Sequence, residues 1–490
     1  MTSGDRCTPL LLCGMLIVPQ CVAASDDFES YRRQQQQGIH KQQAEFQSYR
    51  EQQDADFADF LKMRWREFDS FQGKVRIKEP KPAHIPVAPG VTPPRQIIAP
   101  KPVAPVRPAP PVPSKPLPVS PDSLRVDFYG NPLDFSFDPA WQRYRSVEQA
   151  SSQAMSAFWT MMSGSRYAQT LQAIDKASQR LKLDDWGRVS LWRAVAQSLQ
   201  PGRKTEQRLL LWYFLIKSGY DVRLGYAGND VYLFVAVRQP VYATKFTRVG
   251  EQTYYAVLAD DRGDSIGRFY TYEANYPVKL KALDISSAAI GFTREVRAER
   301  SLSFDYKGQA VKLSVPYDRS LVEYLEGFPQ SEFALYFDTD GSSLLRRSVL
   351  AELRTYTAKM KEQEAVNFLL AFVQRAFAYK TDNDQFGREK YFFIEESLYF
   401  PYNDCEDRSV LFAWLVRELT GLKVIGLLYP GHMTTAVALT QPGNGMASVE
   451  HHGQRFVIAD PTYIGATVGM AMPAYAATKP SQIVAIRNGS

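Results

Sequence analysis

The feature that most constrains this chain is a proline-rich segment, residues 79–122, which begins EPKPAHIPVAPGVTPPR and contains about half of the 31 prolines. Proline fixes φ and lacks a backbone N–H, so this density excludes a helix and a central strand. Extended polyproline II at roughly 3.1 Å per residue would span about 130 Å. We therefore predict a linker, with a ligand for an SH3-type domain as the weaker alternative.

The N-terminal stretch MTSGDRCTPLLLCGMLIVPQCVAASDD combines one Arg, a short apolar run and small residues ending at Ala24. This order is typical of a secretory signal peptide. We expect residues 1–24 to be removed, with cleavage near Ala24, and the protein to be periplasmic or secreted. Lipid modification of Cys21 is disfavoured because Gln20 stands where a small residue is needed. No later apolar run is long enough for a transmembrane segment in the mature chain.

Residues 25–78 are rich in Gln and charged side chains and carry regularly spaced aromatic pairs. Three such pairs follow one another at intervals of 11 residues: Phe46 and Tyr49, Phe57 and Phe60, Phe68 and Phe71. An 11-residue period corresponds to about 3.67 residues per helical turn, so the pairs predict one slowly drifting stripe on a long helix. We expect a coiled coil or partner-binding arm, with possible self-association through residues 26–73. The alternative is a helix that packs on its own protein.

Length and composition allow two or three globular domains after the linker. The chain has 490 residues, of which 45% are hydrophobic and 22% charged. The formal net charge of +6 comes partly from the linker and forms no dense basic patch. A nucleic-acid partner is therefore not expected.

The residues after the linker mix helical and strand patterns. Helical periodicity dominates 141–218, and segments rich in β-branched and aromatic residues fill 221–317. Helical periodicity returns over 343–380. We predict domains at 123–279 and 341–490, joined by a strand-rich connecting region at 280–340.

The stretch NDCEDRSVLFAWLVRELTG contains Cys405, the only cysteine outside the first 21 residues. Its apolar spacing predicts a helix that starts beside the thiol, with Asn403 or Asp404 as N-cap and Asp407 supporting it. Free N–H groups and a partial positive charge at a helix N-terminus favour a thiolate and could hold an oxyanion. Glu406 and Asp407 oppose that effect, so a neighbouring base is still needed.

Two further segments supply the partners of a nucleophilic thiol. His432 follows a glycine in YPGHMTTAVAL and starts an apolar strand, and Asp460 ends the strand in RFVIADPTY. A carboxylate that accepts from an imidazole fixes its tautomer, which would complete a triad of Cys405, His432 and Asp460. Taken singly, each residue could instead be a core cysteine, a turn or a strand terminator.

These three segments resemble the transglutaminase-like (papain-related) cysteine domain of many bacterial proteins, over roughly residues 341–475. The resemblance implies Cys405 as nucleophile, His432 as base and acid, and Asp460 as the residue that orients the imidazole. It also implies an α+β fold in which the Cys helix packs against an antiparallel sheet. The family includes proteases, amidases, cross-linking enzymes and inactive members.

An internal repeat extends the resemblance to the first globular domain. Residues 205–237 align with the Cys405 segment, which places Thr205 at Cys405, Asn229 near His432 and, further on, Glu273 at Asp460. We predict a degenerate transglutaminase-like domain at 123–279 without catalytic chemistry. Two unrelated helices, each followed by a strand, are the alternative.

The function that best fits these observations is a secreted cysteine hydrolase, a peptidase or amidase that acts through a thioester on a cell-envelope protein or peptide. One alternative is a non-catalytic cell-envelope scaffold that binds peptides. Another is a cross-linking transamidase. No cofactor and no metal are expected for any of the three.

Overall fold

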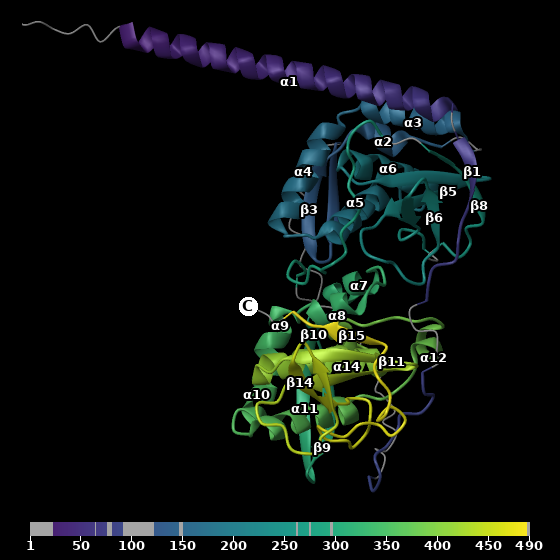
Figure 1. Ribbon diagram of the computed structural model, residues 1–490. Helices are drawn as coiled ribbons and strands as arrows, with labels where there is room; N and C mark the ends of the chain where they lie inside the picture. Colours follow the sequence, from purple (N-terminus) through teal and green to yellow (C-terminus); the bar gives the residue numbers. More distant parts are fainter. Residues whose placement is uncertain are drawn as a thin grey trace, which may run out of the picture. The chain divides into compact units, whose positions relative to one another are not determined.

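The computed structural model describes residues 23–63, 65–75, 81–91, 122–146, 150–260, 263–273, 276–294 and 297–487 (Figure 1). The predicted signal peptide up to residue 22 and linker residues 92–121 lie outside them. The chain divides into two compact units, Met1–Phe57 and Ala58–Ser490. The described residues form helices and antiparallel sheets joined by turns and irregular segments, so the predicted α+β class is confirmed.

The predicted long helix is present but shorter than expected. Helix α1 spans Ala23–Met63 and keeps Phe46 and Tyr49 exposed. The prediction of a helix up to residue 78 is wrong, because strand β1 (Trp65–Asp69) pairs antiparallel with β8 (Arg268–Tyr272). Phe68 lies on that strand and so does not continue the aromatic stripe. The open edge of a sheet offers backbone partners that sequence periodicity does not report.

The N-terminal half of the second unit, residues 122–294 with β1, contains a six-stranded antiparallel sheet in the order β1-β8-β4-β5-β7-β6. Helices α5 and α6 pack on one another, and α6 packs on β4 and β5. The elements not yet placed are β2 (Ser123–Phe128), β3 (Asn131–Ser136), α2 (Pro139–Arg143), α3 (Ser152–Ser163), α4 (Tyr167–Arg180), α5 (Asp185–Leu199), α6 (Lys204–Lys217), β4 (Val222–Ala227), β5 (Asp230–Ala236), β6 (Phe246–Val249) and β7 (Gln252–Tyr255).

The predicted strand-rich region at 280–340 contains a single long hairpin and two helices within its described residues. The elements are β9 (Arg297–Tyr306), β10 (Gln309–Asp318), α7 (Arg319–Glu326) and α8 (Phe333–Asp338). The ring of Phe304 on β9 lies 5.4 Å from those of Phe368 and Phe372 on α11 (Glu362–Ala376). The hairpin therefore packs on the C-terminal half rather than forming a separate spacer.

The C-terminal half, residues 297–487, contains a five-stranded antiparallel sheet in the order β13-β14-β12-β11-β15. Helix α14 packs on β11 and β12, and α11 packs on α14. The remaining elements are α9 (Ser343–Leu345), the π-helix η1 (Arg346–Leu350), α10 (Ala351–Thr357), α12 (Asp382–Phe386), α13 (Ile394–Tyr399), α14 (Cys405–Thr420), β11 (Val424–Tyr429), β12 (His432–Val437), β13 (Ser448–His451), β14 (Gln454–Ala459) and β15 (Gln482–Ala485).

The two halves share one topology. In each half a helix (α6 or α14) is followed by a hairpin, β4–β5 or β11–β12. A second hairpin follows, β6–β7 or β13–β14, and its second strand pairs with the second strand of the first hairpin. A last strand, β8 or β15, pairs with the first strand of the first hairpin, β4 or β11. Within the described residues, the sheet of the N-terminal half has one further strand, β1, at its edge. This common order agrees with the predicted repeat.

Strand register corrects the predicted equivalences within this repeat. Glu273 does not correspond to Asp460, because it follows β8, which takes the place of β15 rather than β14. The last residue pair before the turn is Ala227 with Asp230 in the first hairpin and Tyr429 with His432 in the other. Asp230 therefore corresponds to His432, and Asn229, predicted to lie near that position, is its neighbour. The segments RFYTYEANY and RFVIADPTY are similar in sequence but do not occupy equivalent strands, because strands of similar composition can occupy different places in an antiparallel sheet.

The helix start is also shifted by one residue. Helix α6 begins at Lys204 and α14 begins at Cys405, so the first helical position holds Lys204 rather than Thr205.

The described part of the proline-rich segment does not behave as a free spacer. Residues 81–91, here called the strap, lie against the C-terminal half. Ala88 N donates to Ile464 O at 2.8 Å and Ile464 N donates to Pro86 O at 2.9 Å, so the strap forms a parallel bridge with the chain after β14. Ala88 is buried. The prediction of an extended spacer over 79–122 is therefore wrong for residues 81–91.

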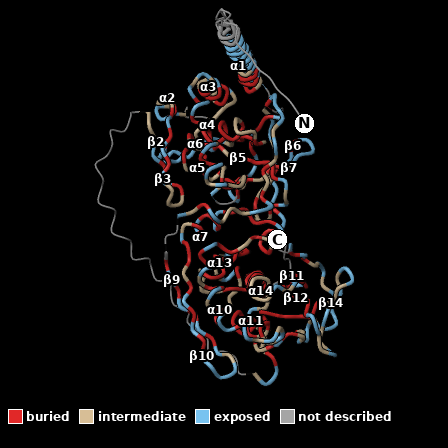
Figure 2. Tube along the Cα trace, turned by 90° about the vertical axis from the view of Figure 1, so that its left-hand side faces the viewer, coloured by how far each residue is buried: buried red, intermediate tan, exposed pale blue. Residues whose placement is uncertain are grey.

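Burial is concentrated along α14, whose residues from Cys405 to Val416 are all buried (Figure 2). Trp414 on this helix packs against Gly341, where an added Cβ would lie 2.5 Å from the indole ring.

Within the ranges that the structure describes, none of the helices combines the length and apolar character that a membrane crossing requires.

Replacing Gly341 by Ala should lower the free energy of unfolding by about 1–3 kcal/mol, because the methyl group overlaps a buried ring held by its neighbours. Urea unfolding followed by tryptophan fluorescence measures the change. Gly267→Ala is the matched control, since a Cβ there meets nothing within 4 Å. An equal effect of both substitutions would contradict close packing at Trp414.

Candidate functional site

Cys405 is the first residue of α14, as predicted. The preceding Asp404 is extended (φ −99°, ψ −156°) and acts as N-cap, and its backbone N–H donates to the Asp407 carboxylate at 3.2 Å. This capping arrangement ends the extended segment and starts the helix at the thiol. The partial positive charge of the helix N-terminus is therefore directed at the sulfur.

His432 and Asp460 form the second part of the site. His432 is the first residue of β12, and Asp460 directly follows β14, which pairs with β12. His432 Nε2 lies 2.9 Å from Asp460 Oδ2, and the other carboxylate oxygen accepts from the N–H groups of Thr462 and Tyr463. The Tyr475 ring stacks on the imidazole at 5.0 Å. Both members of the predicted pair are thus held in a fixed orientation.

The charge state of His432 depends on both neighbours. Burial alone would lower its pKa, but Asp460 and Cys405 outweigh that effect and raise the pKa to about 10. The hydrogen bond to Asp460 contributes to the rise. With Nε2 on Asp460, the buried Nδ1 has no hydrogen-bond partner among the described residues. This ring nitrogen is the one available to the thiol, so the structure brings all three predicted residues together.

Tyr379 covers the thiol. Its hydroxyl lies 3.8 Å from Cys405 Sγ and donates to Pro82 O of the strap at 2.8 Å. Burial and the nearby Cys405 raise the pKa of Tyr379, so its hydroxyl keeps its proton. The exposed fractions of Cys405, His432 and Asp460 are 0%, 1% and 2%. The thiol is therefore inaccessible to solvent in this structure, whereas His432, Asp460 and Tyr475 line a pocket beside it.

A buried cation occupies the space beside the Cys405 helix. The ammonium group of Lys81, on the strap, lies 3.2 Å from Asp382, 2.8 Å from Glu389, 2.5 Å from Asp404 and 3.2 Å from Glu406. The Lys81 side chain is 2% exposed. Burial would lower the pKa of Lys81, but the four carboxylates outweigh it and raise that pKa well above its ordinary value. Lys81 therefore carries its charge inside the protein.

The carboxylates around Lys81 are crowded. Burial and the charge of Asp404 raise the pKa values of Asp382, Glu406 and Asp407 well above their usual range. Asp382, Asp404 and Asp407 could each offer one oxygen to a divalent cation, with the three atoms within 4.8 Å of one another. Lys81 already supplies the positive charge at two of these groups. The donor set therefore fits an ammonium ion better than a metal.

Two buried side chains connect the Cys405 helix with the Asp460 segment. Gln374 on α11 donates to Asp460 O at 2.9 Å and accepts from Gly465 N at 3.0 Å. Arg408 on α14 donates to Gln374 O and Phe377 O at 3.2 and 2.9 Å. These bonds set the distance between the two elements that carry the reacting groups.

The sequence did not single out Lys81, Tyr379, Gln374 or Tyr475. Lys81 stands between two prolines, in a segment whose composition indicated a spacer. The other three belong to amphipathic or irregular stretches in which polar side chains are common. Their roles follow from contacts between residues far apart in sequence, such as Lys81 and Asp404, which no local pattern reports.

Replacing Lys81 by Met should lower the free energy of unfolding by about 3–5 kcal/mol at pH 8, because uncompensated carboxylates remain buried. These acids bind protons more readily in the folded than in the unfolded protein, since folding raises their pKa values. Protonation relieves their repulsion in the variant, so the loss should be smaller at pH 5. Urea unfolding at both pH values measures it, with exposed Lys359→Met as control. An equal loss at both pH values would contradict a charge-based role.

Replacing Asp460 by Asn should lower the midpoint of the His432 titration from about 10, because the carboxylate stabilises the charged ring. NMR of histidine labelled with nitrogen-15 measures the midpoint. A raised folded pKa contributes stability that is complete below the ordinary value of 6.5 and is lost as pH rises through about 10. The stability difference between wild type and variant should therefore shrink between pH 8 and 10. An unchanged midpoint would show that Asp460 does not stabilise the protonated imidazole of His432.

Comparisons with known proteins add no assignment to this geometry. No model of a protein family matches the chain, and no curated protein matches it. Cys405, His432 and Asp460 are therefore assigned as a candidate site on their positions, contacts and chemistry alone.

Proposed function

We propose that the protein is a cysteine-nucleophile acyl-transfer enzyme, a peptidase or amidase of the transglutaminase-like type. One observation carries the proposal: His432 bonds Asp460 at 2.9 Å while the same imidazole interacts with Cys405 at a helix N-terminus. A thiolate beside a charged imidazole is the form that attacks acyl carbons. Cofactor and metal play no part in this chemistry as proposed.

The proposed reaction has two steps that share one imidazole. The Cys405 thiolate attacks a carbonyl carbon, and the backbone N–H groups that begin α14 hold the resulting oxyanion. His432 donates its proton to the leaving amine, and the C–N bond breaks to leave a thioester on Cys405. Neutral His432 then takes a proton from water, the hydroxide displaces the sulfur, and the acid product leaves. Asp460 keeps the imidazole oriented throughout.

The proposed substrate is a protein or peptide of the cell envelope. The signal peptide predicted at residues 1–24 would place the protein in the periplasm or outside the cell, where such substrates lie. Water is the abundant acceptor there, so hydrolysis is favoured over cross-linking. A transamidase would follow the same first step and pass the acyl group to an amine instead.

A non-catalytic peptide-binding scaffold is the second candidate. It is supported by the complete burial of Cys405 and by the first half, where α6 begins with Lys204 and β5 begins with Asp230, so that neither element starts with a thiol or an imidazole. In the enzyme, substrate binding must move Tyr379 or the strap away from the sulfur. In the scaffold no such movement is needed.

Alkylation by iodoacetamide separates the candidates. In the enzyme, the reaction of Cys405 at pH 6 should be nearly as fast as at pH 8, and His432→Ala should slow the pH 6 reaction about tenfold or more, because the imidazolium stabilises the thiolate. Mass spectrometry locates and times the label. Ordinary thiol behaviour, with a rate that rises steeply with pH and does not change in the variant, would favour the scaffold.

Cys405→Ser is the control for labelling, made like the wild type without residues 1–24, since no other cysteine lies outside the first 21 residues. Hydrolysis and transamidation are then compared by incubating the wild type with envelope protein and a labelled primary amine. Covalent amine incorporation that requires Cys405 would replace the hydrolase proposal with the transamidase.

A further inference from the structure

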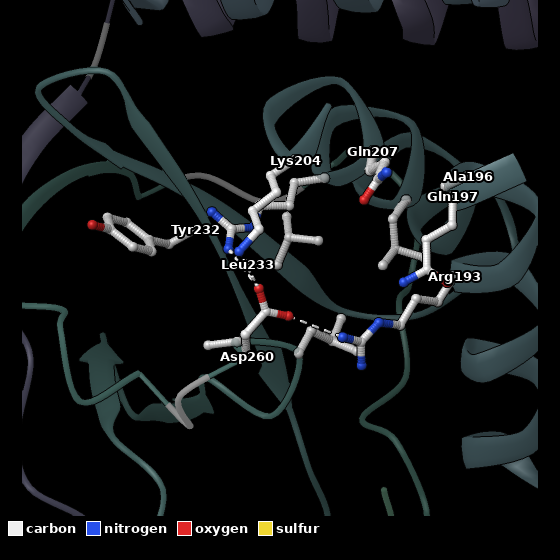
Figure 3. Close-up of a pocket in the computed structure, with 12 residues that line it drawn as sticks. Arg193, Ala196, Gln197, Lys204, Gln207, Tyr232, Leu233 and Asp260 are labelled. Carbon is white, nitrogen blue, oxygen red and sulfur yellow. Dashed lines mark hydrogen bonds and ion pairs between the residues drawn. The ribbon is translucent and has the colours of Figure 1, made fainter. Parts of the chain in front are cut away.

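A pocket in the N-terminal half lies at the start of α6, with a volume of about 650 Å³ that includes its open mouth (Figure 3). Helices α5 and α6, strand β5 and the segment after β7 line it. By the shared topology, this is the place that Cys405 and the segment after β14 occupy in the C-terminal half. The pocket is therefore a separate site on the same framework.

Its chemistry is cationic rather than nucleophilic. Lys204 and Arg193 donate to the two oxygens of Asp260 at 2.8 and 3.2 Å, and Arg208 lies 4.0 Å from the same carboxylate. The hydrogen bond from Lys204 is the main reason that the pKa of Asp260 is lowered. Figure 3 shows Arg193 and Lys204, from two different helices, beside Asp260.

The lining residues carry three positive charges against the one negative charge of Asp260. A guanidinium group has several N–H donors in a planar fork that matches a carboxylate. Arg208 gives one of them to Val231 O, and Arg193 gives one to Asp260. Asp260 therefore shows how the pocket holds a carboxylate, and the remaining donors and charge leave room for a second one.

Apolar groups lie next to these cations. Leu211, Leu233 and Leu258 line the pocket. All three are buried in the core and so present fixed surface. A ligand that fits both parts has a carboxylate adjacent to an apolar side chain. The C-terminal residue of a peptide has this chemistry, whereas a phosphate or a strongly charged polymer would leave the leucine surface uncovered.

We propose that this pocket binds a carboxylate with a neighbouring apolar group, such as a peptide C-terminus ending in an aliphatic residue. Arg193 and Lys204 bind the carboxylate, and the leucine surface accepts the side chain. The proposal does not depend on catalysis at Cys405, because the pocket contains its own recognition groups.

Isothermal titration of the full chain with N-acetyl-Ala-Leu tests the proposal, with N-acetyl-Ala-Leu-amide as the matched ligand lacking the charge. The Kd of the acid should be about tenfold lower or better, since the amide loses a charged hydrogen bond. Arg193→Gln and Lys204→Gln should each weaken binding of the acid about tenfold. Both side chains are partly exposed, so the variants should keep the wild-type melting temperature.

Arg125→Gln is the control, because Arg125 forms an exposed ion pair with Asp134 on the β2–β3 hairpin, outside the pocket lining. It should leave the Kd unchanged. Binding of 4-methylpentanoate as tightly as the peptide acid would support the same recognition and identify a free amphipathic acid as the source of the carboxylate. Equal binding of acid and amide, displacement by inorganic phosphate at similar concentration, unchanged affinity of Arg193→Gln, or no saturable binding would overturn the proposal.

Discussion

The ammonium group of Lys81 sets the electrostatic conditions of the whole candidate site. Four carboxylates converge on it from α12, α14 and the residues around them, and all lie in the interior or at its edge. Without a cation their mutual repulsion and lost hydration would oppose folding of the segment that starts α14. Since Cys405 is the first residue of that helix, the geometry of the thiol depends on a residue more than 300 positions earlier in the chain. A segment with the composition of a spacer thus contributes to the core.

The same pair of elements serves different chemistry in the two halves. A helix on a hairpin presents its N-terminus to the segment that follows the second hairpin in both cases. In the C-terminal half this place holds a thiol, an imidazole and a carboxylate, braced by Gln374 and Arg408. In the N-terminal half it holds Arg193, Lys204 and Arg208 around Asp260. The framework therefore places polar side chains at the same position in both halves, and the residues at the helix start differ in their chemistry.

Local sequence patterns predicted the elements well where burial is periodic. The helix starting at Cys405, its cap at Asp404 and the strands that begin at His432 and end before Asp460 all lie where the patterns placed them. The patterns failed where pairing is decided at a distance. The aromatic spacing of α1 continues into the sequence of β1, so the sequence pattern alone predicted helix there. Pairing with β8 is what makes this segment a strand. Glu273 failed as the counterpart of Asp460 for the same reason, because composition does not specify which neighbour a strand pairs with.

The sequence by itself determined the position of the thiol at a helix start and offered Cys405, His432 and Asp460 as candidate residues. These follow from short-range capping, periodicity and residue chemistry. The α+β class followed from the resemblance to a known family. Tertiary structure alone decided that His432 bonds Asp460, that Tyr379, bonded to the strap, lies over the thiol, and that Lys81 lies among the carboxylates. Such contacts join residues tens to hundreds of positions apart, and their energies depend on burial, which no local window of sequence contains.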